Sequence, residues 1–211
     1  HLGNLLVDRG RIVFLDLQRA RFLPWVPAAL RRWELGYLAY SLGEPLPAEL
    51  AGVRFWRDRR AQTHWRSRSR RCLAESGGFT AFEFAGQKGF RRRDSDEARL
   101  RSLLASLEGQ APFKDAAKTR LFRLDASVVK QHARERDARA AWLGGNGLEA
   151  RGISTATALA WVGRSLVMED AGPTLDAWVD RELERASGAV RDELAERLGS
   201  LLATLHRRGI Y

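Results

Sequence analysis

The amino-acid sequence predicts an α+β protein, and two observations support this class. Between residues 79 and 169, short runs of alternating apolar and polar residues are separated by turn residues, as in antiparallel strands. Residues 194–205 instead place leucines at intervals of three and four, as on one face of a helix. From residue 79 onward the order is therefore strands with one helix among them, followed by helices, which is typical of α+β proteins.

The first 71 residues are predicted to contain a hairpin and two helices. The apolar run Arg11–Leu15 follows a turn at Asp8-Arg9-Gly10, which indicates a hairpin strand. Pro27 suits the first turn of a helix, and Gly43 suits its end. The segment Arg54–Arg71 interleaves arginines with Phe and Trp, and we interpret it as a basic helix.

A strand and its partner begin the second part of the chain. Phe79–Phe84 alternates as a strand does, Gly86 and Gly89 indicate a turn, and Gly89–Arg93 is predicted to return as the partner strand. Asp94–Glu108 is predicted to be a helix because acidic residues occupy its first turn and its leucines share one face.

The remaining segments follow from the same patterns. Arg120–Leu124 and Ser127–Gln131 are predicted to pair around a turn at Asp125-Ala126. A helix over Arg134–Arg151, weakened by internal glycines, should end at Gly152. The last predictions are a hairpin of Ala158–Val162 with Ser165–Glu169 around Gly163, a helix from Leu175 capped by Thr174, and a final helix that ends near Gly209.

The composition is that of a globular, strongly basic protein. The chain has 211 residues and a net charge of +10, and only four of its 36 basic residues are lysines. Such an excess indicates either a solvated basic surface or an anionic partner. Cys72 is the only cysteine, so no internal disulfide can form, which favours a reducing compartment. No apolar run is long enough for a transmembrane helix. Because the chain begins with His1, we expect it to be part of a longer polypeptide.

Two oxygen-bearing residues near the start of the chain fit a magnesium site. Asn4 precedes an apolar strand and Asp16 follows it, so a hairpin would bring both side chains to the same end. Hard oxygen ligands of this kind suit Mg²⁺. Either residue alone is commonplace in a turn or at a strand end. The full string Gly-Asn-Leu-Leu-Val, a turn, and Ile-Val-Phe-Leu-Asp-Leu-Gln is more specific.

Lys130 and the segment Ser165–Gly172 are the candidates for a nucleotide site. In a chain so rich in arginine, a lysine that closes the apolar strand Ser127–Lys130 indicates a need for a compact ammonium group. The other interpretation is a lysine that faces solvent at a strand end. Ser165–Gly172 has the form of a strand that leads into a hinge, whose backbone would bind the edge of an adenine ring, or it is an ordinary strand and turn.

At these residues the chain resembles the lipopolysaccharide kinase family, bacterial relatives of protein kinases that phosphorylate sugars of the lipid A–core region. The resemblance covers nearly the whole chain. The segments that carry it are His1–Val7 with Phe14–Phe22, and Lys114–Gln131 with Leu148–Ile153, Ser165–Gly172 and Leu198–Tyr211. It implies a protein-kinase-like fold: a C-lobe portion followed by an antiparallel-sheet N-lobe with helices.

The resemblance also implies an activity and its residues. The expected reaction transfers the γ-phosphate of ATP to a sugar hydroxyl of the lipopolysaccharide core, on the cytoplasmic side of the inner membrane. The implied metal ligands for Mg²⁺ are Asn4 and Asp16. The implied nucleotide-binding residues are Lys130, Met168, Glu169 and Lys118. The segment Arg54–Arg71 is expected to contact an anionic membrane surface.

The order of these segments is the reverse of a kinase's, because the metal-binding part precedes the lysine strand. We therefore expect three regions: residues 1–53 from the C-lobe of a first kinase-like unit, a basic helix or linker over 54–71, and the N-lobe and start of the C-lobe of a second unit over 72–211. A fragment of a tandem-kinase polypeptide and a permuted single unit both account for this order.

Several departures from the family pattern leave other functions open. The catalytic aspartate of the His-x-Asp loop is absent, and Ala141 stands before Trp142 where a glutamate should hold Lys130, with Glu135 as a weak substitute. We expect this chain alone to bind nucleotide weakly or not at all. The alternatives are a pseudokinase or scaffold and a basic nucleic-acid-binding module around Arg54–Arg71, the latter less favoured because the stretch lacks a named nucleic-acid motif.

Overall fold

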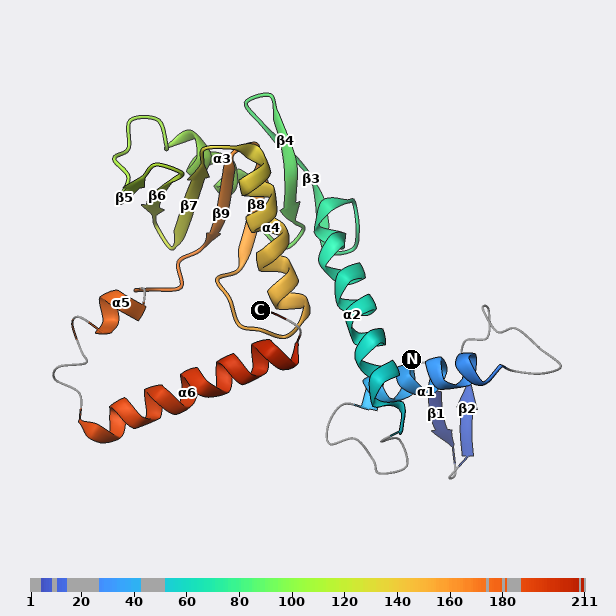
Figure 1. The fold of residues 1–211 in the computed structure, drawn as a ribbon. Coiled ribbons are helices and arrows are strands. Elements are labelled where there is room, and N and C mark those ends of the chain that lie inside the picture. The colour runs from blue at the N-terminus through green and yellow to red at the C-terminus, as the bar shows by residue number, and fades with distance from the viewer. Residues whose placement is uncertain are drawn as a thin grey trace. The chain divides into compact units, whose positions relative to one another are not determined.

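A computed structural model describes residues 5–8, 11–14, 27–42, 52–173, 175–179, 181, 187–208 and 210 (Figure 1). The chain divides into two compact units, residues 1–64 and residues 65–211. Helix α2 (Arg54–Arg70) contributes residues to both units. Asn4, Asp16 and Thr174 lie outside the described residues, so the predictions that concern them stay predictions.

The first unit contains a hairpin and a helix, as the sequence predicts. Strands β1 (Leu5–Asp8) and β2 (Arg11–Phe14) pair antiparallel, with Leu5 opposite Phe14. Helix α1 (Ala28–Leu42) begins directly after Pro27. Trp33 of α1 meets Trp56 of α2 edge to face, with ring centroids 6.3 Å apart. Gly36 permits this approach, because a Cβ atom there would lie 2.7 Å from the Trp56 Cβ.

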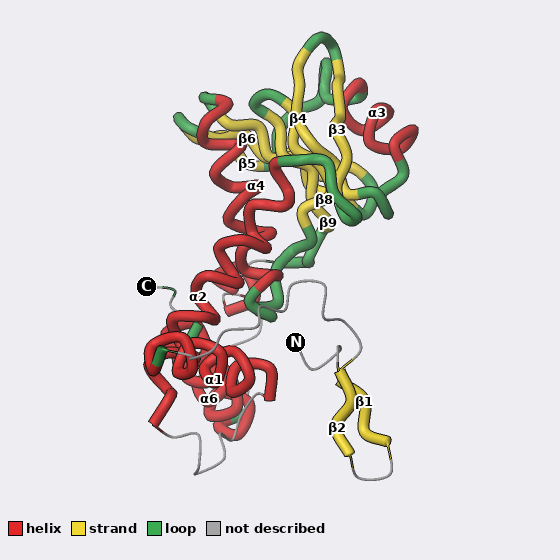
Figure 2. The backbone as a smooth tube through the Cα atoms, turned by 90° about the vertical axis from the view of Figure 1, so that its right-hand side faces the viewer, coloured by secondary structure: helices red, strands yellow, loops and turns green. Residues whose placement is uncertain are grey.

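The second unit is built on a seven-stranded antiparallel sheet with the strand order β3-β4-β8-β9-β7-β6-β5. Alternating side chains along each strand point to opposite faces, and each face is covered by one helix. Figure 2 shows α3 and α4 on opposite sides of the sheet. The strands are β3 (Phe79–Phe84), β4 (Gln87–Arg92), β5 (Lys114–Ala116), β6 (Thr119–Leu124), β7 (Ser127–His132), β8 (Ala158–Val162) and β9 (Ser165–Glu169).

Helix α3 (Glu97–Ala105) covers one face. It begins at Glu97 rather than at Asp94, because the Asp96 carboxylate caps it by accepting a hydrogen bond from the Arg99 N–H at 3.1 Å. The buried leucines of α3 pack against alternate side chains of five strands. This cluster consists of Phe82, Leu100, Leu103, Leu104, Phe122, Val129, Ala160, Val162 and Val167.

Helix α4 (Glu135–Ala150) covers the opposite face. Trp142 is fully buried there, lies edge to face on Phe79, and donates its indole N–H to the Cys72 carbonyl at 2.8 Å. That hydrogen bond joins α4 to the short 3-10 helix η3 (Arg71–Leu73) that follows α2. The α4-side cluster consists of Cys72, Ala138, Trp142, Ala158, Trp161 and Leu166. Gly147 has a packing role in α4, since a Cβ atom there would lie 3.3 Å from the Ser69 hydroxyl.

Of the two roles predicted for Gly89, the turn is wrong and the partner strand is confirmed, although this strand, β4, begins earlier, at Gln87. Gly89 lies inside β4 opposite Phe82, and the turn consists of Ala85 and Gly86. Close packing against the neighbouring strand β8 requires glycine here, because a Cβ atom on residue 89 would lie 1.8 Å from the Trp161 carbonyl oxygen.

The chain ends in α5 (Leu175–Trp178) and α6 (Gly188–Arg207). The predicted leucine face of α6 is present, but no residue of this helix is buried. Leu201 and Leu202 are 45% and 55% exposed. A search of the described helices finds none with the length and apolar character of a membrane span.

Candidate functional site

Strand β7 positions Lys130 on the face of the sheet that α4 covers. Lys130 lies opposite Leu121 on one side and Leu166 on the other. Leu166 belongs to the α4-side cluster, and directly opposite residues of an antiparallel pair share a face. The Lys130 side chain is half-buried, and no ion pair joins it to any described residue. Within the described structure, the Lys130 ammonium is therefore not paired with a carboxylate.

Met168 and Glu169 follow Lys130 across the β7–β9 ladder but point to opposite faces. Met168 lies opposite Val128 and packs against the α4-side cluster, so it shares the face of Lys130. Glu169 lies opposite Ser127, on the α3 face. The Glu169 carboxylate contributes to the wall of a different cavity of about 520 Å³ beside α3. Only the backbone of Glu169 is therefore available to a ligand that contacts Lys130.

Most backbone N–H groups at and after the end of β9 already donate hydrogen bonds within the protein. The Glu169 N–H donates to the Thr157 carbonyl at 2.9 Å, and the Asp170 N–H donates to the Ala126 carbonyl at 3.0 Å. The Gly172 N–H donates to the Asp170 carboxylate at 3.0 Å. The Ala171 N–H has no acceptor among the described residues. This segment thus offers one backbone donor at the end of the sheet where β9 finishes.

Lys118 lies at the opposite end of the same strands. The segment Lys114–Arg120 forms a β5–β6 hairpin, and Lys118 is an exposed residue of its turn. The Lys118 carbonyl accepts a hydrogen bond from the Ala133 N–H at 2.9 Å, which ties the turn to the end of β7. Lys118 lines a cavity of about 410 Å³ together with His132 and Arg164. This end of the sheet is therefore rich in basic side chains.

The strand register places Met168, Lys130 and His132 in a row on one face, and Lys118, in the turn before Thr119, lines the same cavity as His132. We call these four residues the Lys130 strip. Residues two apart on a strand share a face and lie about 7 Å apart. Met168, opposite Val128, is thus one step from Lys130, and His132 is one step beyond it in the direction of Lys118. An extended ligand along this row would have a backbone donor at one end and cations at the middle and the other end.

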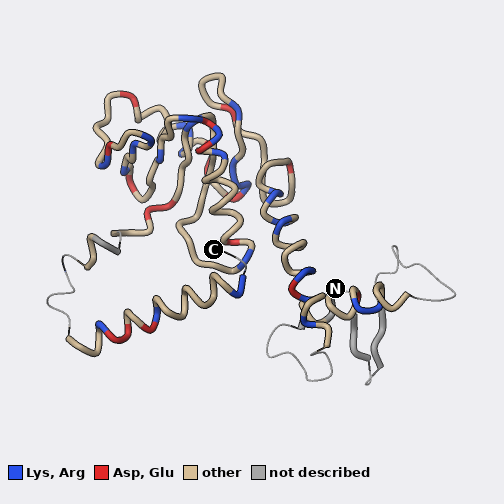
Figure 3. Tube along the Cα trace, in the orientation of Figure 1, with Lys and Arg blue, Asp and Glu red and all other residues tan. Residues whose placement is uncertain are grey.

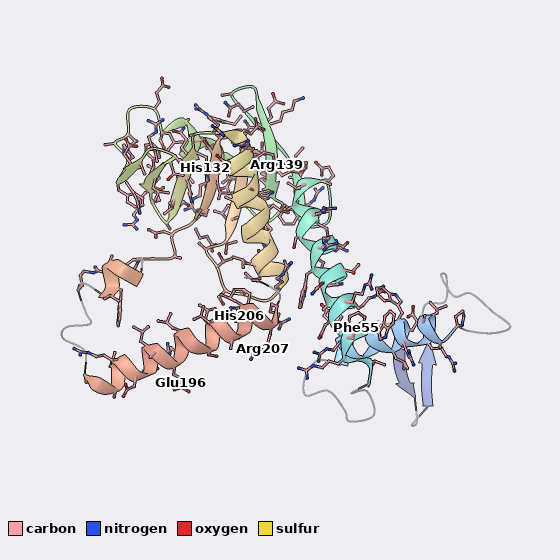
Figure 4. All side chains as sticks on the ribbon, viewed as in Figure 1. Phe55, His132, Arg139, Glu196, His206 and Arg207 are labelled. Carbon is pink, nitrogen blue, oxygen red and sulfur yellow. The ribbon has the colours of Figure 1, made fainter. Side chains whose placement is uncertain are left out.

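His132 is a residue of the strip that the sequence analysis missed. Its side chain is 8% exposed, and its Nε2 atom has no hydrogen-bond partner in the described part of the chain. Burial, and then the charge of Lys130, lower the pKa of His132, while Asp137 opposes them. Figure 4 labels His132 at the end of β7, shortly before α4 begins. The period of two from Val128 through Lys130 was the signal that His132 shares their face.

Helix α4 supplies no carboxylate partner for Lys130 within the described structure. Glu135 is exposed at the first position of α4 and forms no ion pair there. Asp137 is half-buried, and its carboxylate lies 3.6 Å from the Arg136 guanidinium. Trp142 fills the core position of the helix, with Ala141 beside it. The glutamate expected before Trp142 as the partner of Lys130 is thus absent, and no other carboxylate of the described α4 residues pairs with Lys130.

The metal site stays a prediction from the sequence. Asn4 and Asp16 lie outside the described residues, which contain no group of three or more His, Cys, Asp or Glu that could hold a metal ion. Cys72 is buried, and burial raises the pKa of its thiol to about 11, so it is neither a nucleophile nor a ready metal ligand at neutral pH.

In comparisons with known proteins, no family model, no curated protein and no solved structure matches this chain.

Proposed function

We propose that this chain carries the nucleotide-binding part of an ATP-dependent, protein-kinase-like phosphotransferase. The observation that supports the proposal best is the position of Lys130, which is half-buried and has no ion pair among the described residues. It lies between the backbone donor after β9 and the further basic side chains beside the β5–β6 turn. Phosphoryl transfer needs this kind of positioned charge more than it needs covalent chemistry from the protein.

Each part of the strip has a role in the proposal. The Ala171 N–H and the Glu169 carbonyl would bind the edge of the adenine ring, with Met168 beneath the ring. The Lys130 ammonium would contact the phosphates, and Lys118 would approach the terminal phosphate from the β5–β6 turn. Mg²⁺ held by Asn4 and Asp16, in the same polypeptide unit or a neighbouring one, would neutralise charge on the phosphates.

The fold is consistent with this assignment at the level of class. The chain is α+β, with an antiparallel sheet and a helix packed on the face that bears the lysine. In protein kinases a strand lysine faces a helix that supplies its glutamate partner. The kinase-like fold itself is part of the proposal.

The acceptor and the location rest on the resemblance to the lipopolysaccharide kinases. We propose a sugar hydroxyl of the lipopolysaccharide core as the acceptor and the cytoplasmic face of the inner membrane as the site of action. Helix α2 would contact anionic lipid there. Figure 3 shows its basic residues spaced along the helix, and its last turn ends in Arg68 and Arg70.

Affinity labelling tests the proposal even where nucleotide binding is weak. An adenosine-based sulfonyl fluoride reacts with a lysine that lies beside a bound nucleoside. The chain has four lysines, of which Lys88 and Lys114 lie outside the proposed site and serve as internal controls. Peptide mass spectrometry should find Lys130 labelled several times faster than Lys88, which is exposed on β4, and Mg·ATP should protect Lys130 but not Lys88. Equal labelling of both lysines without protection would refute the proposed site.

One observation favours a second candidate, a pseudokinase or scaffold. Lys130 lacks the carboxylate partner that active protein kinases require, at least within the described residues. In that case the affinity probe would still label Lys130, but the longer polypeptide would not transfer radiolabelled phosphate from ATP to lipopolysaccharide core acceptors. Transfer of the label would exclude the scaffold.

A further inference from the structure

The largest cavity among those described in the second unit, about 710 Å³, lies away from the Lys130 strip. We call it the arginine cavity. Its walls are the end of α2, the turn before β3, the end of β4 and the last turns of α4. Met168 and Lys130 of the strip lie on β9 and β7, which are two and three strands further along the sheet from β4. Its volume is within the usual range for a small-molecule site. The lining residues that matter here are Arg68, Arg71, Gly77, Gly78, Asn146 and Glu149.

Two of the four arginines in this cavity are already neutralised. The Arg92 guanidinium lies 3.2 Å from the Asp94 carboxylate and 2.8 Å from the Glu149 carboxylate. Arg93 lies 2.7 Å from Glu75 and also donates to the Ser76 carbonyl. Arg92 and Arg93 therefore hold the wall of the cavity together.

Arg68 and Arg71 are different, because no carboxylate of the described residues lies within ion-pair distance of either guanidinium. They come from the last turn of α2 and the first position of η3, and both are exposed. A planar guanidinium without a partner is the side chain best suited to bind a phosphate group through two parallel hydrogen bonds.

The turn at Gly77-Gly78 adds backbone donors to the same cavity. Neither glycine has a positive φ, and a Cβ atom on either would meet nothing within 4 Å, so neither conformation nor packing requires glycine. The turn is held by hydrogen bonds from the Ser76 N–H to the Phe79 carbonyl and from the Arg93 N–H to the Gly78 carbonyl, both 3.0 Å. The N–H groups of Gly77 and Gly78 have no acceptor in the described structure. Successive unpaired N–H groups are typical of anion sites.

Hydrogen-bond acceptors complete the lining. Asn146 is 6% exposed, and its Nδ2 atom donates to the Trp142 carbonyl at 2.9 Å, which leaves its Oδ1 atom as an acceptor. The Glu149 and Asp94 carboxylates retain lone pairs beyond those that Arg92 uses. Such groups accept hydrogen bonds from hydroxyl groups, such as those on the organic part of a phosphate ester.

We propose that the arginine cavity binds a phosphate monoester whose organic part carries hydroxyl groups. Arg68, Arg71 and the Gly77 and Gly78 N–H groups bind the phosphate, and Asn146 and Glu149 accept from the hydroxyls. The ester is either a soluble metabolite or the headgroup of a lipid. The inference uses none of the residues of the Lys130 strip, so its failure would leave the nucleotide proposal intact.

Isothermal titration with glycerol 3-phosphate tests the site, with glycerol as the ligand that lacks phosphate. The double variant Arg68→Gln/Arg71→Gln removes the two unpaired guanidinium groups. The matched control Arg54→Gln/Arg59→Gln removes the same charge from exposed positions of the same helix outside the cavity. We expect affinity to fall about a hundredfold in the first variant, roughly tenfold for each charge-assisted contact, and less than about twofold in the control.

Equal losses in both double variants would overturn the proposal, because they would show general attraction to a basic chain. A second variant, Gly78→Leu, places a side chain in open space at the cavity and should weaken binding about tenfold without lowering the melting temperature. Unchanged affinity in Gly78→Leu would also overturn it. Sedimentation with vesicles that contain phosphatidic acid identifies the source. Vesicle binding that the cavity variant abolishes and the Arg54→Gln/Arg59→Gln control retains indicates a lipid headgroup, and binding of glycerol 3-phosphate alone indicates a soluble ester.

Discussion

Replacing Trp142 with Phe tests how α4 is held on the sheet, and hence how the Lys130 strip is formed. Trp142 is fully buried, and its indole N–H satisfies the Cys72 carbonyl at 2.8 Å. Phe keeps an aromatic ring against Phe79 but removes the donor and part of the buried volume. The substitution therefore separates the hydrogen bond from most of the packing.

The expected loss has two parts. A buried carbonyl left without its donor costs about 1–3 kcal/mol. The smaller ring leaves a void, and because complete removal of a buried Trp or Phe side chain costs about 3–5 kcal/mol, the partial loss should cost about 1 kcal/mol. The free energy of unfolding should thus fall by about 2–4 kcal/mol in Trp142→Phe, and by a similar amount or more in Trp142→Ala.

Two assays measure this loss. Urea unfolding followed by circular dichroism gives the free energy directly. Cys72 is the only cysteine and is buried beside Trp142, so its labelling by a thiol reagent reports the opening of this cluster. A loss of about 2 kcal/mol should speed labelling roughly thirtyfold when opening and reclosing are fast relative to labelling. Phe113→Leu serves as a control because Phe113 is 52% exposed.

A Trp142→Phe variant within about 0.5 kcal/mol of the parent would refute this reasoning. It would mean that water or another donor satisfies the Cys72 carbonyl and that α4 is not anchored to η3 by this bond.

Three further predictions follow from single residues. Burial raises the pKa of Cys72 from 9.0 to about 11, so the unfolded chain loses the thiol proton at a lower pH than the folded chain does. The free energy of unfolding should therefore fall by roughly 2–3 kcal/mol between pH 9 and 11, and urea unfolding of Cys72→Ala should lack this pH dependence. Burial and Lys130 lower the pKa of His132, so the folded chain resists protonation and stability should fall as the pH drops below about 6.5; an equal acid dependence in His132→Gln would contradict this. Gly89→Ala should cost about 2–4 kcal/mol in urea unfolding because it meets the Trp161 carbonyl, whereas Gly144→Ala in α4, with open space around it, should add about 0.5–1 kcal/mol.

Much of the secondary structure was predictable from the sequence because its causes are local. Asp125 takes a positive φ of 51° and Gly163 one of 51°, and each lies in the turn that the sequence placed between two strands. Gly152, with a φ of 69°, follows the end of α4 as predicted. Leucine spacing identified the buried face of α3, although the Asp96 cap shortened the helix.

The candidate site was predictable only in part. Lys130 and the β9 segment were identified from residue type and alternation, and the ladder brings Lys130 and Met168 to one face. The sequence did not reveal that the Glu169 side chain faces α3, nor that His132 is buried beside Lys130. Both facts depend on which helix covers which face.

By itself, then, the sequence determined where the chain turns, which segments are strands or helices, and how basic the protein is, since each depends on neighbouring residues. The tertiary structure alone decided that β4 pairs with β8, so that Gly89 must lack a side chain, and that α2 ends beside β4, so that Arg68 and Arg71 meet Gly77 in one cavity. These contacts join residues far apart in the chain. Their free energies depend on how the helices pack on the sheet, so no pattern of neighbouring residues can predict them.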